Sequence, residues 1–111
     1  MKIEGDGQRL RIYCGENDQH EGSPLAEAIV LLARERGLAG ATVFRGAMGY
    51  GANSRIHTAK VLRLSESLPT VVEIVDREDR IQAFIPQVNP MVQEGMITVE
   101  PVHIITYRHS R

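Results

Sequence analysis

Aromatic residues and cysteine are scarce in this sequence. Its 111 residues include two phenylalanines, three tyrosines, no tryptophan and one cysteine, Cys14. A single cysteine cannot form an internal disulfide, which fits a reducing cytoplasm, and we expect Cys14 to act as a small buried apolar residue. The core must therefore be built from aliphatic side chains, and the length suits one domain over residues 1–111.

Long apolar runs and an excess of basic residues are also missing. No apolar run approaches the length of a membrane span, and the opening MKIEGDGQ lacks the apolar core of a signal peptide. The net charge is −1, whereas a dedicated nucleic-acid binder usually carries a basic excess. No Walker loop, nucleophile elbow or zinc-ligand spacing occurs. We therefore expect a cytoplasmic protein that binds no nucleic acid, holds no metal and is not an enzyme.

The first half of the chain alternates between strand and helix patterns. Gln8–Cys14 alternates apolar and polar residues, which predicts a half-buried strand. Ser23 followed by Pro24 is a helix-start signal, with Ser23 as the side-chain cap and Pro24 at the first helical position. We expect this helix to close at Gly37. Residues 41–50 begin as a strand whose glycines weaken or bulge the far end.

The second half repeats this order. Thr70–Asp76 predicts a strand, and Asp76 can cap a second helix. Pro86 and Pro90 lie within the helical pattern and should kink or divide that helix, before Gly95 ends it. The apolar face of this helix is expected to contain Ile81, Phe84, Ile85 and Val88.

The last segment, residues 96–107, reads as a strand interrupted by Pro101, a residue that belongs at a sheet edge, a bulge or a strand start. Residues 51–69 are ambiguous, and KVLRLS within them suits a short strand or a helical turn. The order βαβ-loop-βαβ predicts a ferredoxin-like α+β fold, a four-stranded antiparallel sheet with two helices on one face. The other face would expose Val and Ile, which oligomerisation would cover.

The stretch LAGATVFRGAMGYGANSRIHT, followed by LRLSESLPTVVEIVD, is similar to the family called Domain of Unknown Function 190. Within it, Gly40–Val43 and the turn Gly49-Tyr50-Gly51 resemble the wider superfamily of PII-like signalling proteins. This resemblance covers nearly the whole chain. It implies a homotrimer with ligand sites in the clefts between subunits and a loop after Gly51 that closes over them.

The resemblance also implies a small-molecule effector, with ATP, ADP or AMP as candidates, and a partner such as an enzyme or a membrane transporter; no cofactor is required. This sequence departs from the PII pattern in three ways. The spacing to the GYG turn is about one residue longer, residues 51–69 contain no tyrosine, and no glycine- and lysine-rich phosphate loop follows the second helix.

The candidate ligand site is centred on the glycines. Gly46, Gly49 and Gly51 can adopt positive φ and allow a ligand or another backbone to approach, and successive N–H groups there can form an anion-binding nest. The alternative is a bulge that only turns the chain. Tyr50 between them can stack on a base or pack against a neighbouring subunit.

Cations surround this turn. Arg45, Arg55 and His57 can bind a phosphate or carboxylate, or remain solvated surface charges. Arg45 can also pair with Glu73 on the neighbouring strand. We expect Tyr107–Arg111 to be a frayed tail, with the alternative that Arg108 reaches a neighbouring cleft in a trimer.

Thr42 and Glu73 should lie on adjacent strands, where either can bond a ligand or simply face outward. Two other functions remain open from the residues. One is a metal-responsive trimer resembling the copper-tolerance proteins, and the scattered histidines argue against it. The other is a small cleft enzyme such as an isomerase, with His57 or Glu73 as base.

Overall fold

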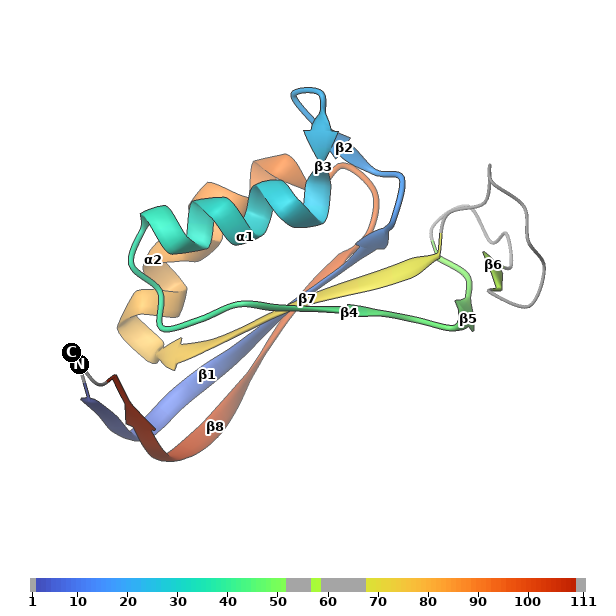
Figure 1. Ribbon diagram of the computed structural model, residues 1–111. Helices are drawn as coiled ribbons and strands as arrows, with labels where there is room; N and C mark the ends of the chain where they lie inside the picture. Colours follow the sequence, from blue (N-terminus) through green and yellow to red (C-terminus); the bar gives the residue numbers. More distant parts are fainter. Residues whose placement is uncertain (1, 52–56, 59–67, 110–111) are drawn as a thin grey trace.

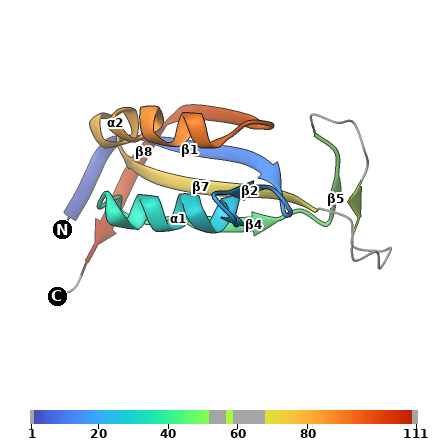
Figure 2. The same cartoon turned by 90° about the horizontal axis from the view of Figure 1, so that it is seen from above.

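A four-stranded antiparallel sheet organises the chain, whose computed structural model describes residues 2–51, 57–58 and 68–109. The strand order is β4-β7-β1-β8, and two helices lie on one face of the sheet (Figures 1 and 2). The predicted ferredoxin-like α+β fold is therefore confirmed. The main elements are β1 (Lys2–Gly15), α1 (Leu25–Glu35), β4 (Thr42–Arg45), β7 (Pro69–Arg77), α2 (Glu78–Val88) and β8 (Met96–Arg108).

The smaller elements are short hairpins and one turn of 3-10 helix. They are β2 (Gln19–His20), β3 (Ser23–Pro24), β5 (Met48–Gly49), β6 (His57–Thr58) and the 3-10 helix η1 (Asn89–Met91). Strands β2 and β3 pair with each other, as do β5 and β6. Among the described helices, none is long and apolar enough to cross a membrane.

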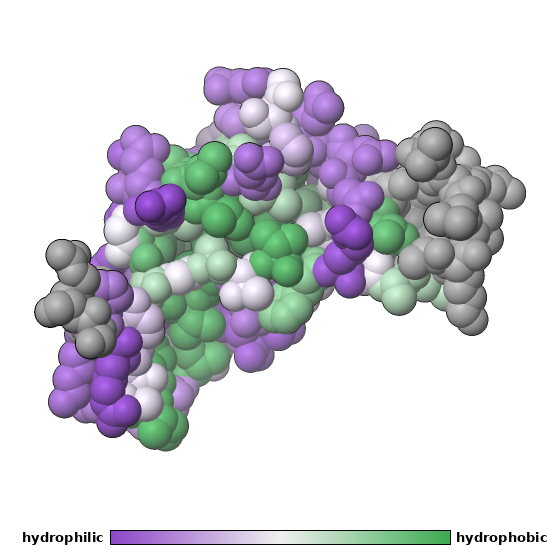
Figure 3. Space-filling view, in the orientation of Figure 1, coloured by the Kyte–Doolittle hydropathy of each residue, from purple (hydrophilic) through white to green (hydrophobic). Residues whose placement is uncertain are grey.

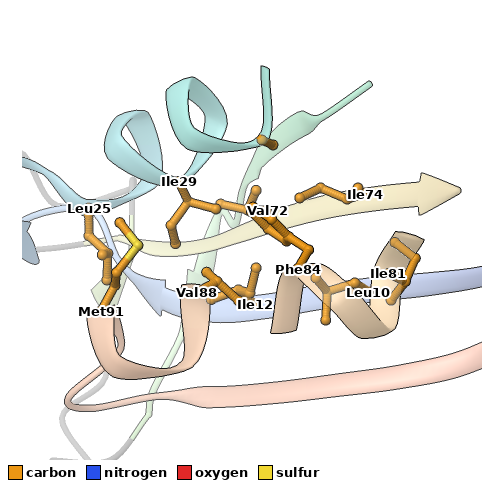
Figure 4. Packing of buried hydrophobic residues seen from close by; sticks show 11 residues of the cluster. Leu10, Ile12, Leu25, Ile29, Val72, Ile74, Ile81, Phe84, Val88 and Met91 are labelled. Atoms are coloured by element: carbon orange, nitrogen blue, oxygen red, sulfur yellow. The ribbon is translucent and has the colours of Figure 1, made fainter. Parts of the chain in front are cut away.

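The core lies between the helices and the sheet (Figure 4). Alternate residues of the two central strands point into it and are almost inaccessible to solvent. It contains Leu10, Ile12, Leu25, Ile29, Ala33, Val72, Ile74, Ile81, Phe84, Val88 and Met91. Burial of such a side chain stabilises the fold by roughly 1.5–3 kcal/mol, so an almost purely aliphatic core suffices, as the composition indicates.

The start of α1 differs from the prediction. Ser23 and Pro24 form strand β3, and Pro24 rather than Ser23 occupies the N-cap position, with no side-chain cap. The free backbone N–H of Leu25 donates instead to the carbonyl of Asp18 at 2.8 Å. The C-terminal end of α1 follows the prediction, because Gly37 has φ +77° and its N–H donates to the carbonyl of Arg34.

Asp76 does not cap α2, contrary to prediction; Arg77 is the N-cap residue. The Asp76 side chain is fully buried. It accepts hydrogen bonds from the N–H groups of Ala39 (2.9 Å) and Arg77 (2.7 Å) and pairs with Arg80 (Nε–Oδ2 3.2 Å). It therefore fastens the turn before β4 to the junction of β7 and α2.

The prolines of the second helix break it less than predicted. Pro86 lies inside α2, two residues from its end, so the helix loses the one N–H donor that proline lacks and only two helical residues follow it. The division falls between Val88 and Asn89, and Pro90 sits in the first turn of η1. Gly95 does not end a helix; a Cβ there would lie 2.2 Å from the Tyr13 carbonyl oxygen, so it permits close passage of the chain.

The final strand is longer than predicted and occupies a sheet edge. Pro101 lies in β8, which confirms its predicted edge position. Tyr107 and Arg108 pair with Ile3 and Lys2, so the prediction of a frayed tail is wrong for these two residues. The same pairing extends β1 well before Gln8, the predicted start.

Replacing Asp76 should destabilise the fold strongly. Asp76→Ala would leave Arg80 and two N–H groups without their buried acceptor, and we expect the free energy of unfolding to fall by about 3–5 kcal/mol. Asp79→Ala is the matched control, because Asp79 forms an exposed pair with Arg77 that contributes at most about 1 kcal/mol. Urea unfolding of both variants measures the difference; equal losses would contradict the role given to Asp76.

Candidate functional site

The glycine-rich turn after β4 packs tightly against Pro69. The N–H of Gly46 donates to the Pro69 carbonyl at 2.7 Å. A Cβ at Gly46 would lie 2.7 Å from Pro69 Cγ, and one at Gly49 would lie 3.1 Å from it. Close approach of another backbone, one of the two predicted uses of these glycines, is therefore confirmed at Gly46. At Gly49 the close neighbour is the side chain of Pro69, and Gly51 has no close neighbour among the described residues.

The other predicted use is wrong. Positive φ among the described glycines occurs at positions 5, 22, 37 and 95, and not at Gly46, Gly49 or Gly51. The turn therefore holds no nest built on left-handed glycines, and the Gly46 N–H is already bonded to Pro69. Glycine is required here for lack of a side chain rather than for a special backbone angle.

A small hairpin lies next to the glycine-rich turn. Met48 and Gly49 of β5 pair with Thr58 and His57 of β6, at the far right of Figure 1. Tyr50 is 69% exposed, so its ring is accessible to a base or to another subunit. Arg55 lies outside the described residues, as do the side chain of His57 and the segment KVLRLS.

Arg45 is bound to the loop after β1 and not to Glu73, contrary to the alternative drawn from the sequence. Its Nε lies 2.6 Å from Glu16 Oε2, and its side chain remains 66% exposed. The strand register explains this outcome, because it places Thr70 opposite Arg45 and Thr42 opposite Glu73. The predicted adjacency of Thr42 and Glu73 is thus confirmed.

The face of the sheet away from the helices, which we call the open face, carries two ion pairs. Arg11 Nε donates to Glu73 at 2.9 Å, and this hydrogen bond raises the pKa of Arg11. Arg9 Nε donates to Glu100 at 2.9 Å, and the same contact lowers the pKa of Glu100. Val75 lies opposite Arg9 and Val71 lies opposite Tyr13 on the same face, and both valines are half-buried. Apolar side chains therefore flank a charged stripe across the middle strands.

A cavity of about 370 Å³ opens on this face beside the start of β4, and we call it the open-face cavity. Residues 39–42, Glu73 and Tyr107 line it, with Val75 and Ile104 as apolar walls. The hydroxyl of Tyr107 donates to the Ala39 carbonyl at 2.9 Å, which ties the end of β8 to the turn before β4. The volume lies within the usual range of about 300–1,000 Å³ for ligand pockets.

Sequence reasoning missed this cavity as a site, although it singled out several of its residues. The stretch Gly40–Val43 carries part of the family resemblance, and Thr42 and Glu73 are candidate ligand contacts from the sequence. The missing step is the contact between Tyr107 and Ala39, because it depends on how β8 bends across the sheet, and no local pattern in the sequence signals that bend.

One chain does not bring all the predicted site residues together. Arg45, Gly46, Gly49, Tyr50 and Gly51 gather at one end of β4. Arg108 is exposed next to Tyr107 at the other end, near the chain termini, and Figure 1 shows these termini and the β5–β6 hairpin at opposite ends of the molecule.

Cys14 and the histidines do not form a reactive or metal-binding centre in the part of the chain that is described. Burial, aided by the charge of Asp18, raises the pKa of Cys14 to about 11, so its thiol stays protonated at neutral pH. Within residues 2–51, 57–58 and 68–109, no group of three or more His, Cys, Asp and Glu side chains could hold a metal ion.

Comparison with known proteins identifies the family. Residues 7–104 match the family DUF190, described as "Uncharacterized ACR, COG1993". The chain belongs to this family. The DUF190 chain is 43% identical over 96 residues to a UPF0166 protein of Aquifex aeolicus (strain VF5), covering 86% of this chain and 90% of that protein. It is 32% identical over 96 residues to UPF0166 protein MJ1524 of Methanocaldococcus jannaschii, covering 86% and 88%.

Solved structures share the fold of this DUF190 protein at low sequence identity. CPII of Thiomonas intermedia K12, bound to ADP and bicarbonate, has a TM-score of 0.65 at 13% identity over 94% of this chain and 91% of that one. A second CPII structure, bound to ADP, AMP and bicarbonate, has a TM-score of 0.68 at 12% identity over the same shares. CutA of Synechococcus elongatus PCC7942 gives 0.59 at 13% identity over 96% and 85%. The PII-like fold expected from the sequence is confirmed.

A side chain at Gly46 should disturb the turn, whereas one at Gly51 should not. Gly46→Ala would force its Cβ against Pro69, so we expect a loss of about 1–3 kcal/mol in the free energy of unfolding. Gly51→Ala is the control, because a Cβ there meets no atom of the described residues within 4 Å, and its effect should stay within about 0.5 kcal/mol. Chemical denaturation compares the two; a neutral Gly46→Ala would show that the contact with Pro69 is not constraining.

The Arg9–Glu100 pair should stabilise the protein only above acid pH. Because Arg9 lowers the pKa of Glu100, the pair contributes stability above the pKa of a free glutamate, about 4.3, and this stability is lost as the pH falls through the lowered value. Glu100→Gln should therefore lower the melting temperature at pH 7 but not in strong acid. A difference that persists at pH 2 would contradict this assignment; Glu94→Gln, at an exposed turn, controls for the lost surface charge.

Proposed function

We propose that this protein is a PII-like regulator, a homotrimer that binds an adenine nucleotide (ATP, ADP or AMP) in clefts between subunits and signals through the loop after Gly51. The observation that carries the proposal is the open-face cavity, which has the size of a ligand site and lies on an uncovered sheet face. The likeness of the fold to CPII, which binds ADP and AMP, supports the choice of ligand.

The chemistry of the cavity suits an adenine base. The carboxylate of Glu73 accepts hydrogen bonds, as does the backbone of residues 39–42, and the exocyclic amino group of adenine donates them. Val75 and Ile104 supply apolar walls for the faces of the base. Such a mixture of apolar walls and a few polar groups is typical of small-molecule sites.

A trimer would complete the site. In a ring, each interface joins two different surfaces of the subunit, so the open-face cavity of one copy can lie beside the glycine-rich turn of the next. Exposed apolar side chains favour such contacts: Leu31, Val43 and Phe44 are each about half exposed, and apolar surface extends from α1 across β4 in Figure 3.

The phosphates would then meet cations. Arg108 follows Tyr107 at the rim of the cavity, and Arg45, Arg55 and His57 belong to the glycine-rich turn and its loop. Arg45 is held by Glu16, so a phosphate must compete with this carboxylate for the guanidinium. Such competition gives the Arg45 side chain two arrangements, on Glu16 or on the nucleotide, and the nucleotide shifts their populations by its differential affinity.

Ligand binding and assembly test this proposal together. We expect light scattering to give three times the chain mass of 12.4 kDa. ADP at about 100 times its dissociation constant should stabilise the fold by roughly 2.7 kcal/mol. Glu73→Gln should weaken ADP binding at least about tenfold, since a carboxylate partner of the base is lost.

Glu100→Gln is the matched control, because Glu100 forms the neighbouring ion pair on the open face but does not line the cavity; ADP affinity should survive this change. Saturating ADP should also slow tryptic cleavage after Arg55, Lys60 and Arg63 in the loop sequence. No stabilisation by ATP, ADP or AMP, or equal losses in the two variants, would overturn the proposal.

A further inference from the structure

A second cavity, lined by three arginines, lies on the helix side of the molecule. It has a volume of about 260 Å³ and is bordered by Arg36 and Leu38 after α1, by Arg77 at the end of β7, and by Arg80 and Gln87 of α2. We call it the arginine cavity. Figures 1 and 2 place the end of α1 and the start of α2 near the chain termini, away from the β5–β6 hairpin.

The positive charge in this cavity exceeds the negative charge that balances it. Arg80 pairs with the buried Asp76 and also donates to the Gly37 carbonyl. Arg77 pairs with Asp79, with its terminal nitrogen 3.1 Å from Oδ2. Neither of these carboxylates pairs with Arg36, the third arginine of the cavity.

Arg36 is the cation left without a carboxylate in the described part of the chain. Its Nε donates to the amide oxygen of Gln87, a neutral group that binds a guanidinium less strongly than an anion does. This hydrogen bond holds the Arg36 side chain at the border of the cavity, with Gln87 reaching it from α2. An oxyanion that replaced the amide oxygen would gain a charge-assisted hydrogen bond.

We propose that the arginine cavity is an anion site that binds a phosphate group, either as inorganic phosphate or as part of a small phosphate ester. Guanidinium groups match the oxygens of phosphate in pairs. Arg36, just after α1, and Arg77, at the end of β7, present two such groups to the cavity. The cavity is smaller than the usual range for drug-sized ligands, about 300–1,000 Å³, which suits a compact anion. The site lies within one subunit and is independent of the nucleotide cleft proposed above.

Calorimetric titration of the nucleotide-free full chain with inorganic phosphate tests this site, with sodium chloride of equal ionic strength as the reference. Arg36→Ala should weaken phosphate binding at least about tenfold, because a charged donor is lost. Gln87→Glu should abolish it, since the new carboxylate would occupy Arg36 while keeping the helices in contact. Circular dichroism verifies that both variants fold.

Two variants act as controls. Arg34→Ala removes the same charge from the same end of α1, at an exposed position outside the cavity, and should leave the phosphate affinity unchanged. Arg108→Ala removes a cation of the proposed nucleotide cleft and should also have no effect. A parallel titration with glycerol 3-phosphate distinguishes free from esterified phosphate, by which of the two binds more tightly.

Three results would overturn the proposal. The first is heat from phosphate that chloride reproduces at the same ionic strength, which would indicate general screening. The second is an unchanged affinity in Arg36→Ala or Gln87→Glu. The third is loss of phosphate binding in Arg108→Ala alone, which would assign the anion to the nucleotide cleft. None of these results bears on whether ADP binds, so the two proposals can fail separately.

Discussion

A single buried carboxylate, Asp76, organises the end of the molecule where both cavities lie. Its oxygens accept the N–H of Ala39 and bind Arg80. Ala39 borders the open-face cavity, and Arg80 borders the arginine cavity. An unpaired buried carboxylate would be too costly to keep charged, so the turn before β4 and the first turn of α2 are both held to the end of β7. Each cavity keeps its shape because this carboxylate fixes one of its walls.

The open face leaves room for the second copy that the proposed nucleotide site requires. The helices bury one side of the sheet, whereas the other side retains apolar side chains around the pairs Arg9–Glu100 and Arg11–Glu73. The charged side chains of these ion pairs can be hydrated, which reduces the cost of exposing the face to water. They also set a fixed charge pattern that a second copy must match. The two halves of the proposed nucleotide site lie at opposite ends of β4, and only another copy can join them.

Much of the fold could be predicted from the sequence, because strand and helix patterns repeat with the periods that one-sided burial imposes. The sequence also indicated which residues outside the apolar core have particular importance, among them Asp76, Gly46 and Arg45, but it did not predict the contacts that these residues make. Asp76 stands where a helix cap should, yet one of its partners, the N–H of Ala39, comes from a turn far away in the sequence. Gly46 is required because Pro69 approaches it, and a local rule about glycine angles cannot anticipate a contact between distant segments. The partner of Arg45 also depends on distant segments. The strand register, which the whole sheet determines, places Thr70 rather than Glu73 opposite Arg45, and Arg45 pairs with Glu16 instead.

The Arg45–Glu16 contact gives the proposed signalling a physical basis within the described residues. The N–H of Glu16 donates to the Leu68 carbonyl at 2.8 Å, and the N–H of Gly46 donates to Pro69. Both ends of the loop, which begins after Gly51 and ends before Leu68, are therefore tied to the same small region as the guanidinium of Arg45. A phosphate that draws Arg45 from Glu16 acts where the loop is anchored, so no long path through the core is needed to link ligand and loop. The Arg45 side chain is two-thirds exposed, and its contact with Glu16 Oε2 does not have the geometry of a hydrogen bond, so the pair is a weak one. A bound nucleotide can replace Glu16 as the partner of Arg45 without loss of the fold.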